Sequence, residues 1–242
     1  MEAAGVTIAY KFLSSGAVGL FSRHRWPTPA GGLPGDWVSV GGELRPCLNG
    51  IHACSATHLV EWLDEELWEI ELEGPVLEDD GELVARAGRL TRRIEGWDEG
   101  CARAFAARCL NGTVELTAES LVKAGREREA QELSESRSRA DAERQVVELA
   151  RSFEDDPSSP VIFLADATRL ARGGRPELVE EAPAADLGGP TAFALAANLG
   201  YVCAHIVAQL AEQQRAGAYE ETFLAERRRQ SLGLAEKLQL PR

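Results

Sequence analysis

Apolar and polar residues alternate with a period of two through the first third of the chain. The clearest case is VTIAYKFL, residues 6–13, where Val6, Ile8, Tyr10 and Phe12 share one face. Such alternation is typical of β-strands. Shorter stretches extend the pattern, and together they predict a small, mostly antiparallel sheet within about residues 5–95: DWVSV (36–40), GIHAC (50–54), LWEIELEG (67–74) and GELVARAGRLTRRI (81–94). A connecting helix is expected over SATHLVEWL, with Ser55 as its N-cap.

The remainder of the chain has a helical pattern. We expect helices at 97–110, 118–154, 158–171, 190–215 and 218–240, with a linker at 172–190 that is rich in Gly, Pro and Ala. The predicted fold class is therefore α+β. Residues 1–96 form a β-rich domain that carries the candidate site, and residues 97–242 form a helical region packed on it.

The charge of the chain limits its partners. The formal net charge is −13, which argues against nonspecific binding to nucleic acid and against an anionic membrane surface. The charge is uneven, because residues 1–58 carry +1 and the rest therefore carries −14. This near-neutral part could hold a small anionic ligand, or it could be an ordinary core with few charges. A partner protein or a second copy could bind through the C-terminal helices.

The composition indicates a reducing compartment. Five cysteines, an odd number, and an N-terminus without a basic segment or a long apolar run predict a cytoplasmic protein. The chain has 23 Arg but only 3 Lys and is rich in Ala, Gly and Leu, a bias of high-GC genomes that favours an actinobacterial source. Residues 187–211 lack formal charges over a length that could span a bilayer. Their glycines and polar residues favour a buried core helix instead.

The stretch CLNGIHACSATH, residues 47–58, contains two cysteines and two of the four histidines. In a strand His52 and Cys54 would point to the same face, and Cys47 and His58 could complete a zinc tetrahedron. The spacing is irregular for structural zinc, so we predict no metal. Cys47 and Cys54 are instead expected to be reduced and buried, and His52 to face Tyr10 or Lys11. His52 would either line a polar site, beside the N-terminus of the helix expected after Ser55, or be a buried histidine bonded to a backbone carbonyl.

Two further groups could bind a ligand. Lys11, one of the three lysines, lies in the first strand and could hold a phosphate or carboxylate if it faces His52; otherwise it is an ordinary edge residue. A basic and aromatic cluster begins the Pro/Gly-rich loop at 23–37 and could pair with and stack on a nucleotide, or simply be solvated: Arg23, His24, Arg25 and Trp26.

Two resemblances follow from these motifs. YKFL, PGDWV, GIHAC and LWEIELEG, within about residues 8–75, resemble an uncharacterised family of bacterial and phage proteins that share a Gly-x-His-x-Cys strand. The order of these strands also resembles the ADP-ribosyltransferase-like fold, in its rifamycin-modifying and RNA phosphotransferase branches. Tyr10 or Lys11 would stand in the first-strand position, His52 in the second, and WEIELEG would be the following strand. The first strand lacks the His-Gly-Thr of that fold, and no late strand offers a clear catalytic acid.

The second resemblance implies an enzyme, or a degenerate enzyme, that binds a nucleotide or similar anion. NAD is the cofactor it implies, although the residues themselves require none. Catalytic roles would fall to His52, Lys11 and Tyr10, and ligand binding to Arg23, His24, Arg25, Trp26 and Cys54. The alternatives are a non-catalytic interaction module and an enzyme of specialised metabolism that acts on an unrelated small molecule.

Overall fold

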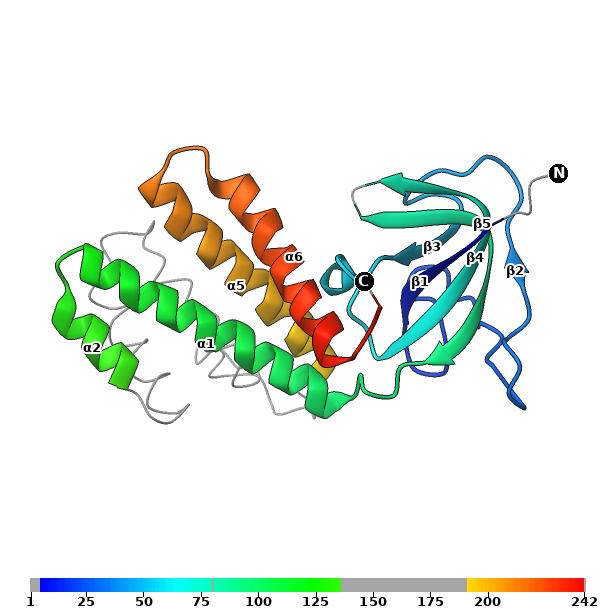
Figure 1. Ribbon diagram of the computed structural model, residues 1–242, viewed down its shortest axis with the longest axis horizontal. Helices are drawn as coiled ribbons and strands as arrows, with labels where there is room; N and C mark the ends of the chain where they lie inside the picture. The colour runs from blue at the N-terminus through cyan, green and yellow to red at the C-terminus, as the bar shows by residue number, and fades with distance from the viewer. Residues whose placement is uncertain (1–4, 80, 136–190, 242) are drawn as a thin grey trace, which may run out of the picture. The chain divides into compact units, whose positions relative to one another are not determined.

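The computed structural model describes residues 5–79, 81–135 and 191–241. The chain divides into two compact units, which are described separately here: residues 1–101 with 228–242, called the barrel unit, and residues 102–227, called the helical unit. The α+β class predicted from the sequence is confirmed, with an antiparallel sheet in the N-terminal part and helices after it (Figure 1). The helix expected at 158–171, the linker at 172–190 and most of the helix at 118–154 lie outside the described residues.

The sheet of the barrel unit closes on itself. Each strand of the circuit β1–β3–β5–β4–β1 pairs with the next, all pairings are antiparallel, and β2 lies beside β5. The strands are β1 (Val6–Leu13), β2 (Val38–Ser39), β3 (Ile51–Cys54), β4 (Glu66–Asp79) and β5 (Glu82–Arg93). Closure removes most of the exposed strand edges that an open sheet of this size would have.

A bend in β4 makes the closure possible. Its first half pairs with β1, its whole length pairs with β5, and the register shifts between Glu73 and Val76. Gly74 lies in this shift with a φ of +84°, which a residue with a side chain adopts only with strain. The sequence predicted a strand that ended at this glycine, whereas the strand continues through it to Asp79.

Alternation places one face of each strand in the barrel core. In β1 the buried members of this face are Ala9 and Leu13, and in β3 they are Ile51 and Ala53. The core also contains two tryptophans and the apolar positions of β4 and β5, and its members are Ala9, Leu13, Ala17, Trp26, Ile51, Ala53, Trp68, Ile70, Leu72, Leu83, Ala85 and Leu90.

The opposite face of β1 contacts Trp97 and residues near the end of the chain. The Tyr10 hydroxyl donates to the main-chain oxygen of Pro241 at 3.4 Å, and Phe12 packs edge-on against Trp97 with ring centroids 5.6 Å apart. The main-chain N–H of Val60 donates to the Ser231 hydroxyl at 3.2 Å. Residues 228–242 therefore belong to the barrel unit although they follow the helical one.

The helix expected to begin after Ser55 is absent. Residues 55–58 form turns, and the only helix there is a single 3-10 turn, Leu59–Glu61. The hydroxyls of Ser55 and Thr57 contact Nδ1 of His58 at 3.1 and 2.9 Å, so these side chains bond locally rather than cap an α-helix. The prediction was wrong because local hydroxyl bonds and the contact with Ser231 outweigh weak helix propensity.

Three consecutive acidic residues anchor the turn after β1. The Ser14 hydroxyl donates to Asp64 at 2.8 Å, and the N–H of Ser15 donates to Glu65 at 2.6 Å. The buried Glu66 carboxylate accepts three hydrogen bonds, from the N–H groups of Gly16 and Ala17 and from the Trp68 indole, at 3.0–3.1 Å. This anchoring fixes the start of the loop that leads to residues 23–26.

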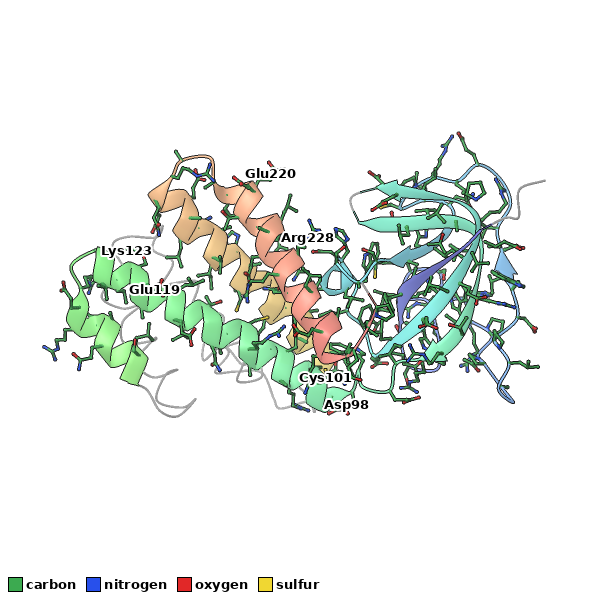
Figure 2. The ribbon with its side chains drawn as sticks, viewed as in Figure 1. Asp98, Cys101, Glu119, Lys123, Glu220 and Arg228 are labelled. Carbon is green, nitrogen blue, oxygen red and sulfur yellow. The ribbon has the colours of Figure 1, made fainter. Side chains whose placement is uncertain are left out.

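The helical unit contains α1 (Glu99–Lys123), α2 (Glu127–Glu135), α5 (Ala192–Gln214) and the first part of α6 (Tyr219–Lys237). Asp98 accepts the N–H of Cys101 at 2.7 Å at the start of α1, where Figure 2 labels both residues. The helix continues through residues 111–117, which the sequence pattern had left between two helices. The predicted helices at 190–215 and 218–240 are confirmed as α5 and α6.

One described helix, α5, is long and apolar enough to cross a membrane by length and composition. Several of its residues are nonetheless fully buried within the protein, among them Ala196, Cys203 and Ile206. Nδ1 of His205 in α5 forms a hydrogen bond of 2.5 Å with the Tyr219 hydroxyl in α6. These features agree with the buried core helix predicted from the sequence.

Glu66→Ala should destabilise the protein by about 3 kcal/mol, because three donors, two of them in buried hydrogen bonds, lose their common acceptor. Urea denaturation monitored by tryptophan fluorescence measures this loss. Glu73→Ala, at an exposed position of the same strand, is the control and should change the stability by less than about 0.5 kcal/mol. Equal effects of the two substitutions would show that Glu66 does not anchor the turn.

Candidate functional site

His52 and Glu82 form the most unusual polar contact in the barrel unit. His52 lies in β3 and Glu82 begins β5, where it pairs with Cys54, so both side chains emerge on the same face. Nε2 of His52 lies 3.8 Å from Oε1 of Glu82, which is too long for a hydrogen bond. Nε2 is buried and has no hydrogen-bond partner among the described residues, and no other buried side-chain atom among them shares this condition.

Both residues of the pair interact with one turn. The main chain of Arg45 acts on the His52 ring by hydrogen bonding, which raises the pKa of the imidazole but less than burial lowers it. Oε2 of Glu82 accepts the N–H of Cys47 at 3.2 Å and its thiol at 3.5 Å. The turn at 45–49 is thus held to the barrel by Glu82.

The charge state of His52 follows from its surroundings. Burial lowers the pKa of His52 below its ordinary 6.5, Glu82 acts in the opposite direction, and Lys11 lowers it further. The imidazole is therefore neutral at neutral pH, and one of its two ring nitrogens carries a lone pair. The helix dipole invoked from the sequence has no part in this shift, because the helix after Ser55 does not form.

Lys11 lies next to His52, as one reading of the sequence expected, but through the main chain. Its amine donates to the carbonyl oxygen of His52 at 2.5 Å and lies 5.2 Å from the centre of the Trp26 ring. Burial lowers the pKa of Lys11 from 10.5 to about 8, with opposing effects from Cys54 and Glu82. The amine is therefore occupied within the protein, and holding an external anion would require it to leave these contacts.

The two cysteines near the pair differ. Cys54 is buried as predicted, and burial raises its thiol pKa to about 12. Cys47 is exposed, which corrects the prediction that it is buried. It lies in a turn with a φ of +59°, and the Glu82 carboxylate raises the pKa of its thiol. Neither thiol is a strong nucleophile at neutral pH.

Tyr10 is also brought close, since it pairs directly with Cys54 across β1 and β3. Burial, followed by the charge of Glu69, raises the pKa of Tyr10. Its hydroxyl donates to the main-chain oxygen of Pro241. Tyr10 thus lies on the same face of the sheet as His52, but its hydroxyl is engaged by a residue near the end of the chain.

The basic cluster divides into two parts. Arg23, His24 and Arg25 are exposed, whereas Trp26 is only 5 % exposed and belongs to the barrel core. His24 packs edge-on against Trp26 with ring centroids 5.9 Å apart. The stacking role expected of Trp26 needs correction, because its ring would have to leave the core to contact a nucleotide.

Glu82 was missed by reasoning from the sequence. It follows Asp79, Asp80 and Gly81, a setting typical of a solvated hairpin turn, yet it is only 5 % exposed. The available signal was its period-two relation to Val84, which is buried. Pairing with Cys54 places the carboxylate beside His52, and no pattern within one segment reveals such a pairing.

No set of three or more His, Cys, Asp or Glu side chains converges on a metal position within the described ranges. His58, considered as a fourth ligand, directs Nδ1 to the hydroxyls of Ser55 and Thr57. The site is described here by its hydrogen-bonding and acid-base groups.

Comparison of the chain with known protein families, with curated proteins and with solved structures found no match.

Lys11→Met should gain stability relative to the wild type at pH 7, and this gain should shrink by about 2–3 kcal/mol by pH 10.5. The unfolded chain holds the Lys11 proton more tightly than the folded one, so wild-type stability rises between pH 8 and 10.5. Denaturant unfolding at several pH values measures the difference. Lys123→Met, at an exposed position, controls for loss of a lysine as such. A pH-independent difference for Lys11→Met would contradict the burial of its charge.

Proposed function

We propose that the barrel unit binds a small polar molecule at the His52–Glu82 pair, and that the protein is an enzyme or degenerate enzyme of the ADP-ribosyltransferase-like type. The observation that carries the proposal is the buried, unpartnered Nε2 of His52. A buried acceptor without a donor costs about 1–3 kcal/mol, and such atoms are uncommon in native proteins. A ligand that donates a hydrogen bond to Nε2 would offset this cost.

A nucleotide of the NAD type is the first candidate. Arg23 and Arg25 are exposed on the loop at 23–37 and could pair with phosphate oxygens. The adjoining sequence carries little net charge, so an anion is repelled less there than by the rest of the chain. The ribose hydroxyls of a nucleotide would supply the donors that Nε2 lacks.

The pair also suits proton transfer. A neutral imidazole can accept a proton from a bound hydroxyl, and the Glu82 carboxylate 3.8 Å away would stabilise the imidazolium that forms. Lys11 would act as a positioning residue, because its amine binds the carbonyl of His52 itself. No catalytic step is assigned to Tyr10 or Cys54, whose side chains are buried.

A second candidate is a non-catalytic interaction module. Phe21 is 86 % exposed, the highest value among the large apolar residues described, and it follows the turn anchored by Asp64, Glu65 and Glu66. A rigidly presented apolar side chain is typical of protein contacts. This reading predicts that Phe21→Ser abolishes a protein partnership and leaves nucleotide binding intact.

NAD and ADP-ribose should raise the melting temperature of the wild-type protein by several degrees, because ligand binding stabilises the folded state. His52→Asn should abolish this shift, since Asn is a smaller polar residue that lacks Nε2. Differential scanning fluorimetry measures both, and nicotinamide release from NAD tests for catalysis.

His205→Ala, which removes a histidine from the helical unit, is the matched control and should retain the ligand-induced shift. A wild-type protein that responds to neither compound would contradict the nucleotide proposal. A response that persists in His52→Asn would place the ligand elsewhere in the molecule.

A further inference from the structure

We propose that the His52–Glu82 pair recognises a vicinal diol, as found in ribose and other sugar rings, by accepting one hydrogen bond from each hydroxyl. This inference rests on the proposed function, and it names the chemical group that the site takes. It follows from three features of the pair: which atoms remain available, how far apart they are, and which charges surround them.

Each residue of the pair has one available atom. Nε2 of His52 has no hydrogen-bond partner among the described residues. Oε2 of Glu82 is held by the N–H and thiol of Cys47, which leaves Oε1. Because β3 pairs directly with β5, the two available atoms are held close to each other. In the neutral tautomer that carries its hydrogen on Nδ1, both atoms are acceptors, so the ligand must supply two donors.

The separation favours two donor atoms over one. A single tetrahedral donor with hydrogen bonds of about 2.9 Å would hold its acceptors about 4.7 Å apart. Nε2 and Oε1 are 3.8 Å apart. Two neighbouring hydroxyls, whose oxygens lie about 2.8 Å from each other, can donate side by side to acceptors at this distance within ordinary hydrogen-bond geometry. A vicinal diol therefore fits better than an ammonium group.

The surrounding charges favour a neutral group. Lys11 and Glu82 are close enough for the carboxylate to raise the pKa of the amine, so Glu82 already has a positive charge nearby. A second cation at the pair would face Lys11, and an anion would face Glu82. The Cys47 and Cys54 thiols, with raised pKa values, are neutral at pH 7, and so is Tyr10. Hydroxyls avoid both repulsions.

Protonation of His52 should compete with the ligand. An imidazolium would donate to Glu82 and remove the acceptor that the diol requires. Because burial lowers the pKa of His52, the acceptor is present at neutral pH and is lost as the pH falls below the ordinary range of histidine. Affinity should accordingly be constant near neutrality and decline in acid.

Isothermal titration calorimetry of the full chain with ATP and 2′,3′-dideoxy-ATP tests the inference, because the two probes carry the same charge and differ in the diol. We expect ATP to bind at least about tenfold more tightly at pH 7.5, the loss expected for missing hydrogen bonds in a buried site. The advantage should disappear in His52→Asn and shrink in acid. His205→Asn, which changes a histidine of the helical unit, should behave as the wild type.

The outcomes separate the two proposals. Equal binding of both nucleotides, lost in His52→Asn, would overturn the diol inference and leave the nucleotide site standing. Binding of agmatine in preference to ATP would show that the pair takes a cation, which also overturns it. No binding of any probe by the wild type would overturn both proposals. The melting temperature of each variant establishes that it is folded at the temperature of titration.

Discussion

The bend in β4 is the constraint on which the barrel unit depends. Because the strand shifts register between Glu73 and Val76, it pairs with β1 along its first half and follows β5 to its end. Strand β3 can then lie between β1 and the start of β5, and the circuit closes. That closure, rather than any local motif, places a histidine of one hairpin beside a glutamate of another.

Two carboxylates are buried in this small barrel, and each is compensated by hydrogen-bond donors. Glu82 is buried, but the N–H and thiol of Cys47 and the nearby charge of Lys11 compensate it. Glu66 is buried too, and three donors fully engage it. The two carboxylates differ in what remains free: Glu66 is a structural anchor, whereas Glu82 lies beside an imidazole nitrogen without a partner. This contrast makes His52 and Glu82 the candidate pair for the proposed function.

Helix α6 is divided between the two units. The helix begins at Tyr219 among the aromatic residues of the helical unit, and from residue 228 it belongs with the barrel. There Ser231 binds the main chain of Val60, and the following segment reaches the Tyr10 hydroxyl at Pro241. Residues 231–241 therefore contact β1 and the segment that follows β3 within the barrel unit.

The sequence by itself determined the α+β class, the strands β1, β3 and β5, and the helices α5 and α6, because period-two and helical patterns reflect burial of one face in each element. It also singled out His52, Lys11 and Cys54. Tertiary structure decided the rest. Ser55 caps no helix, because its hydroxyl bonds to His58. Trp26 lies in the core, Cys47 is exposed, and the buried Glu82 belongs to the candidate site. These outcomes depend on pairing between strands that are distant in sequence. The energy of such pairing depends on several segments together, so the residue pattern of a single segment does not reveal it.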